Sequence, residues 1–208
     1  MRHVTIAGIA GYFEKKHMME QDISKAAAIL RDGGVVIFPT DTVWGIGAWI
    51  GSKAGIAKLY TLKKRDRNKP TALLVGSLEQ AFKYGQFSAE AIILAERYWP
   101  GALTVVVEAT ADVPKALQNG RGGVGIRWPK LALVTDLCEQ LPGGIAASSA
   151  NEAGDRAPVE WGEVSKDLLA KSDFVIPAES ALTGISSTVV DLMDGRPKII
   201  RQGEVWLR

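Results

Sequence analysis

The stretch that decides the expected fold is VVIFPTDTVWGIG, residues 35–47. Its first four residues are apolar and mostly β-branched, and they stand between the pair Gly33-Gly34 and Pro39. A short apolar run between two breaking signals is typical of a buried strand rather than a helix. In α/β proteins ligands bind where strands end in loops, so the residues after this strand are the first place to look for a site.

Polar residues follow this strand immediately. Thr40 and Thr42 supply hydroxyls and Asp41 supplies a carboxylate, while Gly45 and Gly47 allow the backbone to turn or to approach another group closely. The same residue types occur in ordinary turns. The stretch by itself therefore favours a binding site only slightly over a turn between a strand and a helix.

The composition predicts one domain. The chain has 208 residues, 47% of them hydrophobic, which is enough for one well-packed domain over residues 1–208 and too few for two. The 25 basic and 23 acidic residues nearly balance, so binding to nucleic acid would require a local basic patch. The single cysteine, Cys138, excludes an internal disulfide. No apolar run is long enough for a bilayer and no signal peptide is recognisable, so we expect a cytoplasmic protein with no membrane partner.

The rest of the chain predicts an α/β domain with a mixed sheet. We expect helices at residues 22–31, 88–98, 131–141 and near 164–170, and one more that Ser52 can cap and that ends in the basic residues 63–70. We expect strands at residues 35–38, 72–75, 103–107, 124–128, 145–147 and 174–176. A hairpin from residue 186 should turn at Asp194-Gly195. Residues 1–20 leave two interpretations open: a strand at 4–9, or a flexible lead-in, because residues 14–17 are polar.

Several familiar catalytic motifs are absent or out of context. GRGGVG, residues 120–125, matches the dinucleotide spacing G-x-G-x-x-G, but it leads into an expected strand rather than a helix, so we reject it as a cofactor site. Both histidines, His3 and His17, lie near the N-terminus, which makes a Ser-His-Asp triad unexpected. No Walker A sequence is present.

The densest basic cluster is KKRDRNKP, residues 63–70, with five cations in seven residues. Cations at the end of a helix complement its dipole, which explains one or two of them. A solvated charged face stays open as the explanation of the rest. Under that explanation Lys63 and Arg65 would lie at the surface, at the end of a helix.

Hydroxyl residues follow three of the expected strands, and Asn151 lies close to one of these groups. They are Thr40 and Thr42; Ser148 and Ser149; and Ser186, Ser187 and Thr188. Hydroxyls and amides suit hydrogen bonds to a ligand rich in oxygen, and Lys or Arg suits its negative charge. Such a site can bind and polarise without a covalent nucleophile. Phosphoryl or nucleotidyl transfer fits it, because positioning and charge stabilisation carry most of that catalysis.

Taken together, five ordered motifs resemble the YrdC/Sua5 family in its short, single-domain form. They are PTDTVWGIG, Lys63-x-Arg65 with Lys69-Pro70, Ser149-x-Asn151, SSTVVD and IIRQG. The resemblance implies a twisted, mostly parallel α/β sheet with flanking helices and a large, positively charged cavity. It also implies an enzyme, a nucleotidyltransferase that makes threonylcarbamoyl-AMP and pyrophosphate from L-threonine, bicarbonate and ATP. The product serves the t6A modification of tRNA.

The resemblance also implies the roles of individual residues. Lys63, Arg65, Ser149 and Asn151 would be catalytic; Arg65, Lys69, Ser149, Asn151 and Arg201 would bind ATP; and Thr40, Thr42, Arg127 and Ser187 would bind threonine. Arg127 would meet the threonine carboxylate. No residue is expected to hold a metal directly, because Mg²⁺ would enter with the ATP phosphates. Two departures from the family pattern, Trp44 and Leu74, fall on the amino-acid side.

The implied partners are a separate tRNA threonylcarbamoyl transferase and, through the basic cluster, tRNA or another RNA. Two alternatives stay open. One is a family paralogue that acts on a different acyl-adenylate or carbamoyl substrate. The other is a non-catalytic module that binds double-stranded RNA or tRNA, which would show salt-dependent RNA binding without pyrophosphate release.

Overall fold

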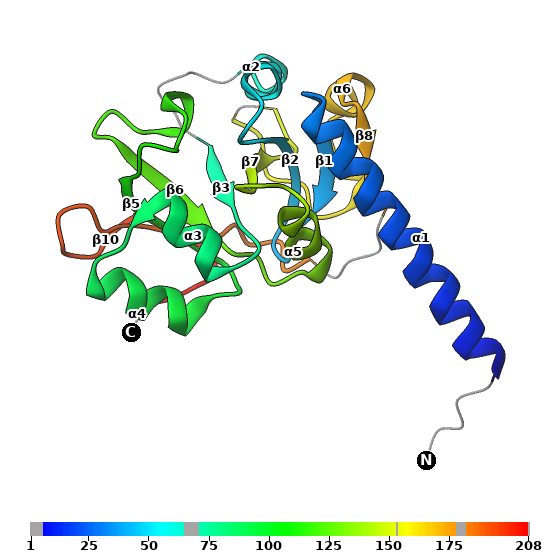
Figure 1. Ribbon diagram of the computed structural model, residues 1–208, viewed down its shortest axis with the longest axis horizontal. Coiled ribbons are helices and arrows are strands. Elements are labelled where there is room, and N and C mark those ends of the chain that lie inside the picture. The colour runs from blue at the N-terminus through cyan, green and yellow to red at the C-terminus, as the bar shows by residue number, and fades with distance from the viewer. Residues whose placement is uncertain (1–5, 65–70, 153, 178–181, 208) are drawn as a thin grey trace.

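The structure is a computed structural model that describes residues 6–64, 71–152, 154–177 and 182–207, with side chains of the first helix from residue 16 onward. Within these residues, ten strands form one sheet with helices on both faces (Figure 1). The helices are α1 (Ile6–Arg31), α2 (Lys53–Leu62), α3 (Leu78–Tyr84), α4 (Ala89–Tyr98), α5 (Ala132–Glu139) and α6 (Lys166–Lys171), with 3-10 turns η1 (Lys115–Leu117) and η2 (Trp161–Glu163). The strands are β1 (Val36–Pro39), β2 (Trp44–Trp49), β3 (Ala72–Leu74), β4 (Gly85–Gln86), β5 (Leu103–Ala109), β6 (Gly123–Arg127), β7 (Ile145–Ser149), β8 (Phe174–Val175), β9 (Thr188–Asp191) and β10 (Lys198–Arg201).

The mixed α/β architecture is confirmed, but the sheet is not mostly parallel. Its order is β10-β9-β5-β6-β3-β7-β2-β1-β8, with β4 paired to β5. In the described part of the chain three pairs are parallel, β1 with β8, β3 with β6 and β5 with β9, and the other pairs are antiparallel. One reason is that no α-helix lies between β1 and β2, between β5 and β6 or between β9 and β10, so the chain is not carried back to the edge where the first strand of each pair began.

The second half of the stretch at residues 35–47 corrects the expected turn and helix cap. After a tight turn, the chain continues as β2, antiparallel to β1 and to β7. The expected close approach is real at Gly47, where a Cβ atom would lie 2.5 Å from Cγ2 of Ile145 and 3.0 Å from the carbonyl of Ala146. The close neighbour is therefore the next strand of the sheet.

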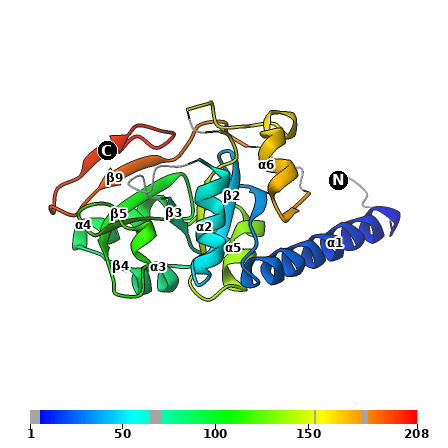
Figure 2. The same cartoon turned by 90° about the horizontal axis from the view of Figure 1, so that it is seen from above.

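Alternating strand residues build one apolar core on each face of the sheet. On one face Ile37, Ile46 and Ile126 belong to a core that includes residues of α2, α3 and α4. On the other, Val36 and Phe38 pack with α1 and α5, which lie side by side (Figure 2). In the described residues this second core draws on β1, β3 and β7 but not on β5, β6 or β9. On this face of the sheet, β5, β6 and β9 are therefore left uncovered by helices.

The first helix is much longer than expected. α1 begins at Ile6 rather than at residue 22, so the strand interpretation is wrong from Ile6 onward, and residues 4 and 5 lie outside the described part. From residue 16 the side chains are mostly exposed until Ile23, which starts the buried face. The sequence did not suggest a helix before that point, because residues 14–17 are polar.

The other expected elements are confirmed within one or two residues at most ends. Ser52 caps α2, with its hydroxyl accepting from the Gly55 N–H at 3.0 Å. GRGGVG leads into β6, as its rejection as a cofactor motif required. The hairpin of β9 and β10 turns at Gly195, whose φ is +73°. The short helix α3 was not expected from the sequence.

No helix in the described part of the chain combines the length and apolar character that crossing a bilayer would require.

Candidate functional site

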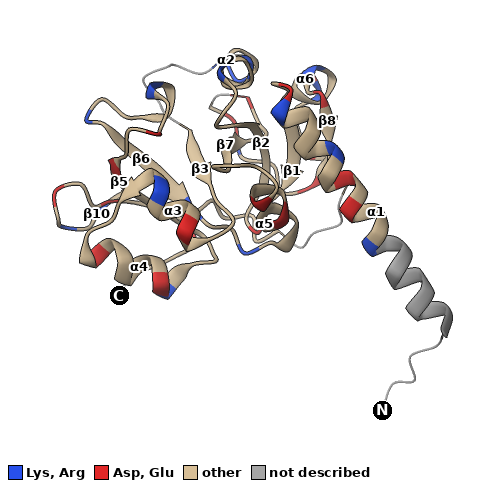
Figure 3. Cartoon of the chain, viewed as in Figure 1, with Lys and Arg blue, Asp and Glu red and all other residues tan. Residues whose placement is uncertain are grey.

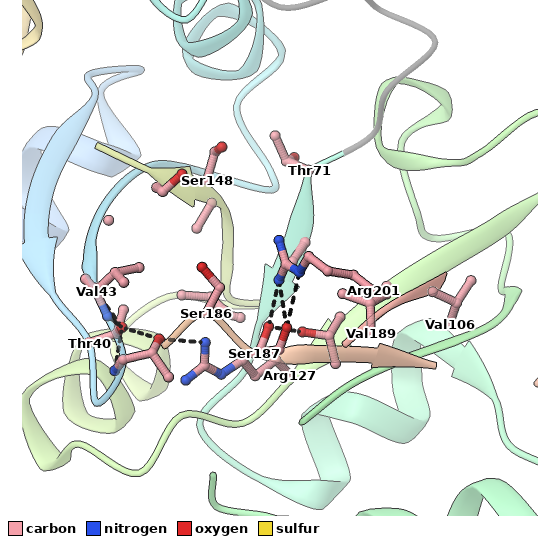
Figure 4. Close-up of a pocket in the computed structure, with 18 of the residues that line it drawn as sticks. Thr40, Val43, Thr71, Val106, Arg127, Ser148, Ser186, Ser187, Val189 and Arg201 are labelled. Atoms are coloured by element: carbon pink, nitrogen blue, oxygen red, sulfur yellow. Dashed lines mark hydrogen bonds between the residues drawn. The ribbon is translucent and has the colours of Figure 1, made fainter. Parts of the chain in front are cut away.

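A cavity of about 480 Å³ lies over the middle of the sheet, on the face that α1 and α5 leave uncovered (Figure 4). Small residues make its floor: Ala147 of β7 and Ala72 of β3 are paired, and Gly125 of β6 lies one strand further on. A Cβ atom on Gly125 would come within 3.3 Å of Thr104. The cavity therefore exists because the residues of three neighbouring strands at its floor have very small side chains or none.

Thr40 builds the turn between β1 and β2. Its hydroxyl donates to the carbonyl of Val43 at 2.8 Å and accepts from the N–H groups of Thr42 and Val43 at 3.1 and 3.2 Å. Thr42 Oγ1 lies 3.0 Å from Thr40 Oγ1, and because the Thr40 proton is used on Val43, Thr42 is the donor of that pair. Both threonines are buried and line the cavity, and the lone pairs of Thr42 are left to accept.

Arg127 lies at the end of β6 with its guanidinium buried in the cavity wall. Its Nε donates to the carbonyl of Gly101 at 3.0 Å, one Nη to Thr42 Oγ1 at 3.0 Å, and the other Nη to Oδ1 of Asp41 at 2.6 Å. Burial lowers the pKa of Arg127, and the negative charge of Asp41 opposes that shift. Arginine remains protonated under such conditions, so the cavity contains a fixed cation.

Ser187 and Arg201 form a second polar group on the opposite side of the cavity (Figure 4). Nε and one Nη of Arg201 donate to the Ser187 carbonyl at 3.1 and 2.8 Å, and the same Nη lies 3.1 Å from Ser187 Oγ. Thr104 Oγ1 is 2.8 Å from Ser187 Oγ, so the serine hydroxyl is held from two sides. Sequence reasoning missed Thr104, which sits within the apolar run of β5.

Lys63 is only 3% exposed, so a solvated face at the helix end does not explain this residue. Its Nζ donates to the carbonyl of Ser149 at 2.7 Å and also to the carbonyl of Asn151. The lysine therefore ties the end of α2 to the end of β7, and the reason is a contact between residues 86 positions apart that helix-end reasoning cannot anticipate.

Ser149 lines the cavity, whereas Asn151 does not belong to the lining. The Asn151 amide donates to the carbonyls of Glu152 and Asp155, both at 2.8 Å, and its oxygen is 3.5 Å from Lys63 Nζ. Asn151 thus orders the loop that follows β7. The helices α2 and α6 each contain two lysines, and both carry blue segments in Figure 3. Arg65 and Lys69 of the basic cluster lie outside the described residues.

The structure therefore brings six expected site residues together around one cavity. They are Thr40, Thr42, Arg127, Ser149, Ser187 and Arg201. In the described part of the lining, the charged side chains are the two guanidinium groups of Arg127 and Arg201. Sequence reasoning also missed Asn119, whose side chain accepts from the Gly123 N–H at 2.8 Å and shapes the rim. Its position directly before the glycine-rich residues 120–125 was the feature of the sequence that could have pointed to Asn119.

Comparison with known proteins identifies relatives of this chain. The family model Sua5_yciO_yrdC, described as "Telomere recombination", matches residues 28–203. A threonylcarbamoyl-AMP synthase of Pyrococcus abyssi is 32% identical over 91% of this chain and 56% of its own length. A putative threonylcarbamoyl-AMP synthase of Mycobacterium leprae is 35% identical over 88% of this chain and 83% of its own length.

Solved structures show the same fold. P. abyssi Sua5 complexed with L-threonine has a TM-score of 0.82 and 33% identity, over 87% of this chain and 54% of that one. E. coli YciO has a TM-score of 0.79 and 25% identity, over 87% of this chain and 88% of that one. This chain spans little more than half the length of the P. abyssi relative. Because the family model covers most of the chain and both ends of the expected motif series, the chain belongs to the Sua5/YciO/YrdC family.

Proposed function

We propose that this chain is a threonylcarbamoyl-AMP synthase, a nucleotidyltransferase that converts L-threonine, bicarbonate and ATP into threonylcarbamoyl-AMP and pyrophosphate. The observation that carries the proposal is one cavity that holds a fixed guanidinium, Arg127, facing a hydroxyl cluster around Ser187 and a second guanidinium, Arg201. The names of the relatives support the same activity, and P. abyssi Sua5 is known in complex with L-threonine.

The amino-acid side centres on Arg127. A guanidinium has five N–H donors, and three of those of Arg127 are used on Gly101, Thr42 and Asp41, which leaves two. Two donors of one guanidinium suit the two oxygens of a carboxylate. We therefore assign the threonine carboxylate to Arg127, with Thr40, Thr42 and Ser187 around the rest of the amino acid.

The nucleotide side centres on Arg201 and the end of β7. Arg201 and Ser149 line the cavity, and we assign them to ATP together with Arg65, Lys69 and Asn151. Mg²⁺ would arrive as MgATP, because it prefers phosphate oxygens and water to a cage made of protein alone. No Asp or Glu belongs to the described part of the cavity lining, which fits an ion held mainly by its substrate.

The proposed reaction has two steps. The amine of threonine combines with bicarbonate, with loss of water, or with carbon dioxide derived from it, with loss of a proton, to give a carbamate. A carbamate oxygen then attacks the α-phosphorus, the bond to the bridging oxygen breaks, and pyrophosphate leaves. Arg201 and Arg65 would stabilise charge that grows on the phosphates, and Lys63 would act at the same end of the cavity. The product would pass to a separate transferase that modifies an adenosine of tRNA.

The test is release of pyrophosphate by the purified chain with MgATP, bicarbonate and each amino acid in turn. We expect release with L-threonine that depends on bicarbonate, and mass spectrometry should identify threonylcarbamoyl-AMP. Release with another amino acid would indicate a paralogue with a different substrate. Salt-dependent RNA binding with no release for any amino acid would overturn the proposal in favour of an RNA-binding module.

A further inference from the structure

The most buried ion pair in the described part of the chain joins Arg127 and Asp41. An Nη of Arg127 donates to Oδ1 of Asp41 at 2.6 Å, and the two side chains are 7% and 14% exposed. Every other ion pair among the described residues has a partner that is more than one-third exposed. A buried ion pair is weak evidence for a role in stability, because removing both charges from water costs much of what their attraction returns. The position of this pair therefore calls for a different explanation.

Asp41 completes a set of contacts that fixes the plane of the guanidinium. Asp41 and Thr42 are neighbours in the turn that Thr40 shapes, and they hold the two terminal nitrogens of Arg127. The Gly101 carbonyl holds Nε from another element. The turn is itself held on its outer side, where the N–H groups of residues 183 and 184 donate to the carbonyls of Asp41 and Thr42. A planar group bound at three points has one orientation.

Asp41 does this from behind the cavity wall. Arg127 lines the cavity and Asp41 does not, so a ligand would meet the guanidinium and not the carboxylate. The charge of Asp41 also offsets the cost of burying Arg127, and Glu204 acts in the same direction from further away, whereas Arg201 acts against it.

We propose that Asp41 is a positioning residue, which fixes the guanidinium of Arg127 so that its two remaining N–H donors meet the carboxylate of the amino-acid substrate. The inference rests on the proposed function, since it takes Arg127 as the carboxylate anchor. Its consequence is selective: loss of Asp41 should impair recognition of the amino acid much more than recognition of ATP.

A purely electrostatic role predicts the opposite result. The negative charge of Asp41 repels a substrate carboxylate, so if charge were decisive, neutralising Asp41 would tighten binding. The variants Asp41→Ala and Asp41→Asn separate the two effects. Asparagine keeps an oxygen that can accept from Arg127 but has no charge, while alanine keeps neither.

The experiment measures pyrophosphate release and calorimetric binding of L-threonine for the wild type, Asp41→Asn and Asp41→Ala. When a group that anchors the substrate is misplaced, the reaction can slow by about 100-fold. We expect a rise of about that size in the threonine KM and Kd of Asp41→Ala, and a rise of less than about 10-fold in Asp41→Asn. The KM for ATP should change by less than about threefold in both. L-threoninamide, which lacks the carboxylate charge, should compete poorly with L-threonine in the wild type and less poorly in Asp41→Ala.

Asp173→Asn is the matched control, because Asp173 also pairs with a cation, Lys58, but lies away from the cavity. It should leave both KM values within about twofold of the wild type. Circular dichroism melting establishes that each variant is folded, and Asp41→Asn carries the test if Asp41→Ala does not fold.

The outcomes separate this inference from the proposed function. Tighter threonine binding in Asp41→Asn, or an equal rise in the KM for threonine and for ATP, would overturn the positioning role while the proposed function stood. A wild-type chain that neither binds nor uses any amino acid would overturn both. A wild-type chain that binds threonine without turnover would overturn the proposed function alone, and the calorimetric comparison would still decide the role of Asp41.

Discussion

At the scale of single residues, the cavity depends on how one planar cation is held. Lysine carries the charge of Arg127 but cannot bond Gly101, Thr42 and Asp41 at once and still present a fork. Arg127→Lys should therefore raise the KM for L-threonine by about 10–100-fold. This factor corresponds to the loss of one or two charge-assisted hydrogen bonds. Steady-state assays of pyrophosphate release would measure this.

The control for that change is Arg121→Lys. Arg121 pairs with Asp191 and Asp194 at the surface and is half exposed, so its replacement should leave the threonine KM within about twofold of the wild type. An equal KM in the two variants would mean that the substrate carboxylate is bound elsewhere.

Thr71 offers a stability test at the same scale. Its hydroxyl is the buried side-chain polar atom that lacks a hydrogen-bond partner within the described part of the chain. Replacing it by a methyl group of the same shape should stabilise the fold, so Thr71→Val should raise the free energy of unfolding by about 1 kcal/mol, or the Tm by about 2–4 °C. Chemical denaturation would measure it.

The comparison variant is Thr188→Val. The Thr188 hydroxyl donates to the carbonyl of Val205 at 2.7 Å and accepts from the Gly203 N–H at 3.0 Å, so its loss should destabilise the fold by about 1–3 kcal/mol. The two threonine-to-valine changes should thus have opposite signs. Destabilisation by both changes would show that the Thr71 hydroxyl has a partner in solution.

Sequence reasoning found the hydroxyl residues that directly follow an apolar run, because strand ends are where loops and ligands meet. It missed Thr104, whose neighbours in β5 are valine and leucine and whose position facing the cavity depends on which face of the sheet the helices leave open. It could not decide whether Lys63 belongs to a site or to a solvated charged face, since the carbonyls that accept from it belong to a distant strand end. Local patterns cannot supply either fact.

At the scale of elements, Lys63 joins α2 to the end of β7. Lys63→Met keeps the length of the side chain but removes its hydrogen bonds to Ser149 and Asn151, so it should cost about 2–3 kcal/mol of stability. If Lys63 also stabilises phosphate charge, turnover per folded molecule should fall by about 10²–10³. Lys64→Met, at a position whose side chain is 70% exposed, should cost less than about 0.5 kcal/mol. A stable, fully active Lys63→Met variant would contradict both roles.

A second tie between elements predicts a dependence on pH. Asp173 accepts from Lys58 of α2 and from the Val35 N–H before β1. Partial burial alone would raise the pKa of Asp173, but the Lys58 and Val35 hydrogen bonds outweigh it and lower the pKa. A lowered pKa means that the stabilisation is present above the unfolded-state pKa, about 3.9, and is lost as the pH falls through the folded-state value.

The measurement compares the unfolding free energy of the wild type and Asp173→Asn between pH 7 and pH 2.5. The difference should be constant above about pH 5 and should shrink as the pH falls below about 4. Asp112→Asn, at an exposed loop position, should show no comparable trend. A difference that grows in acid would mean that the pair does not favour the ionised aspartate.

Most elements were predictable, and the failures have physical causes. A strand such as β5 is a long apolar run, and α2 has a serine cap and an apolar face, so local signals sufficed. β2 contains Gly45 and Gly47, which read as a turn, and it becomes a strand through pairing with β1 and β7. The N-terminal part of α1 was not expected to be helical, because residues 14–17 are polar. Pairing with β7, which lies far along the chain, decided the first case, and a polar stretch of sequence obscured the second.

At the scale of the whole molecule, the two sides of the cavity are joined by direct hydrogen bonds. Arg201, assigned to the nucleotide, holds the carbonyl and hydroxyl of Ser187, assigned to the amino acid. The hydroxyl of Ser187 also forms a hydrogen bond with that of Thr104, so the contact extends to strand β5 of the sheet. If ATP phosphates bind Arg201, they would restrict Ser187 as well before threonine binds. The second ligand would then bind more tightly, because part of the cost of ordering its site has already been met.

We expect a non-hydrolysable ATP analogue to lower the Kd of L-threonine by about 5-fold or more, and L-threonine to lower the Kd of the analogue by the same factor, since coupling between two binding sites is reciprocal. Calorimetric titrations in both orders would measure the two factors. Arg201→Lys should weaken the coupling more than it weakens threonine binding alone, because lysine cannot hold the Ser187 carbonyl and hydroxyl from one planar group. Independent binding of the two ligands in the wild type would show that the Arg201–Ser187 contact transmits nothing, and the two halves of the cavity would then have to be treated as separate sites.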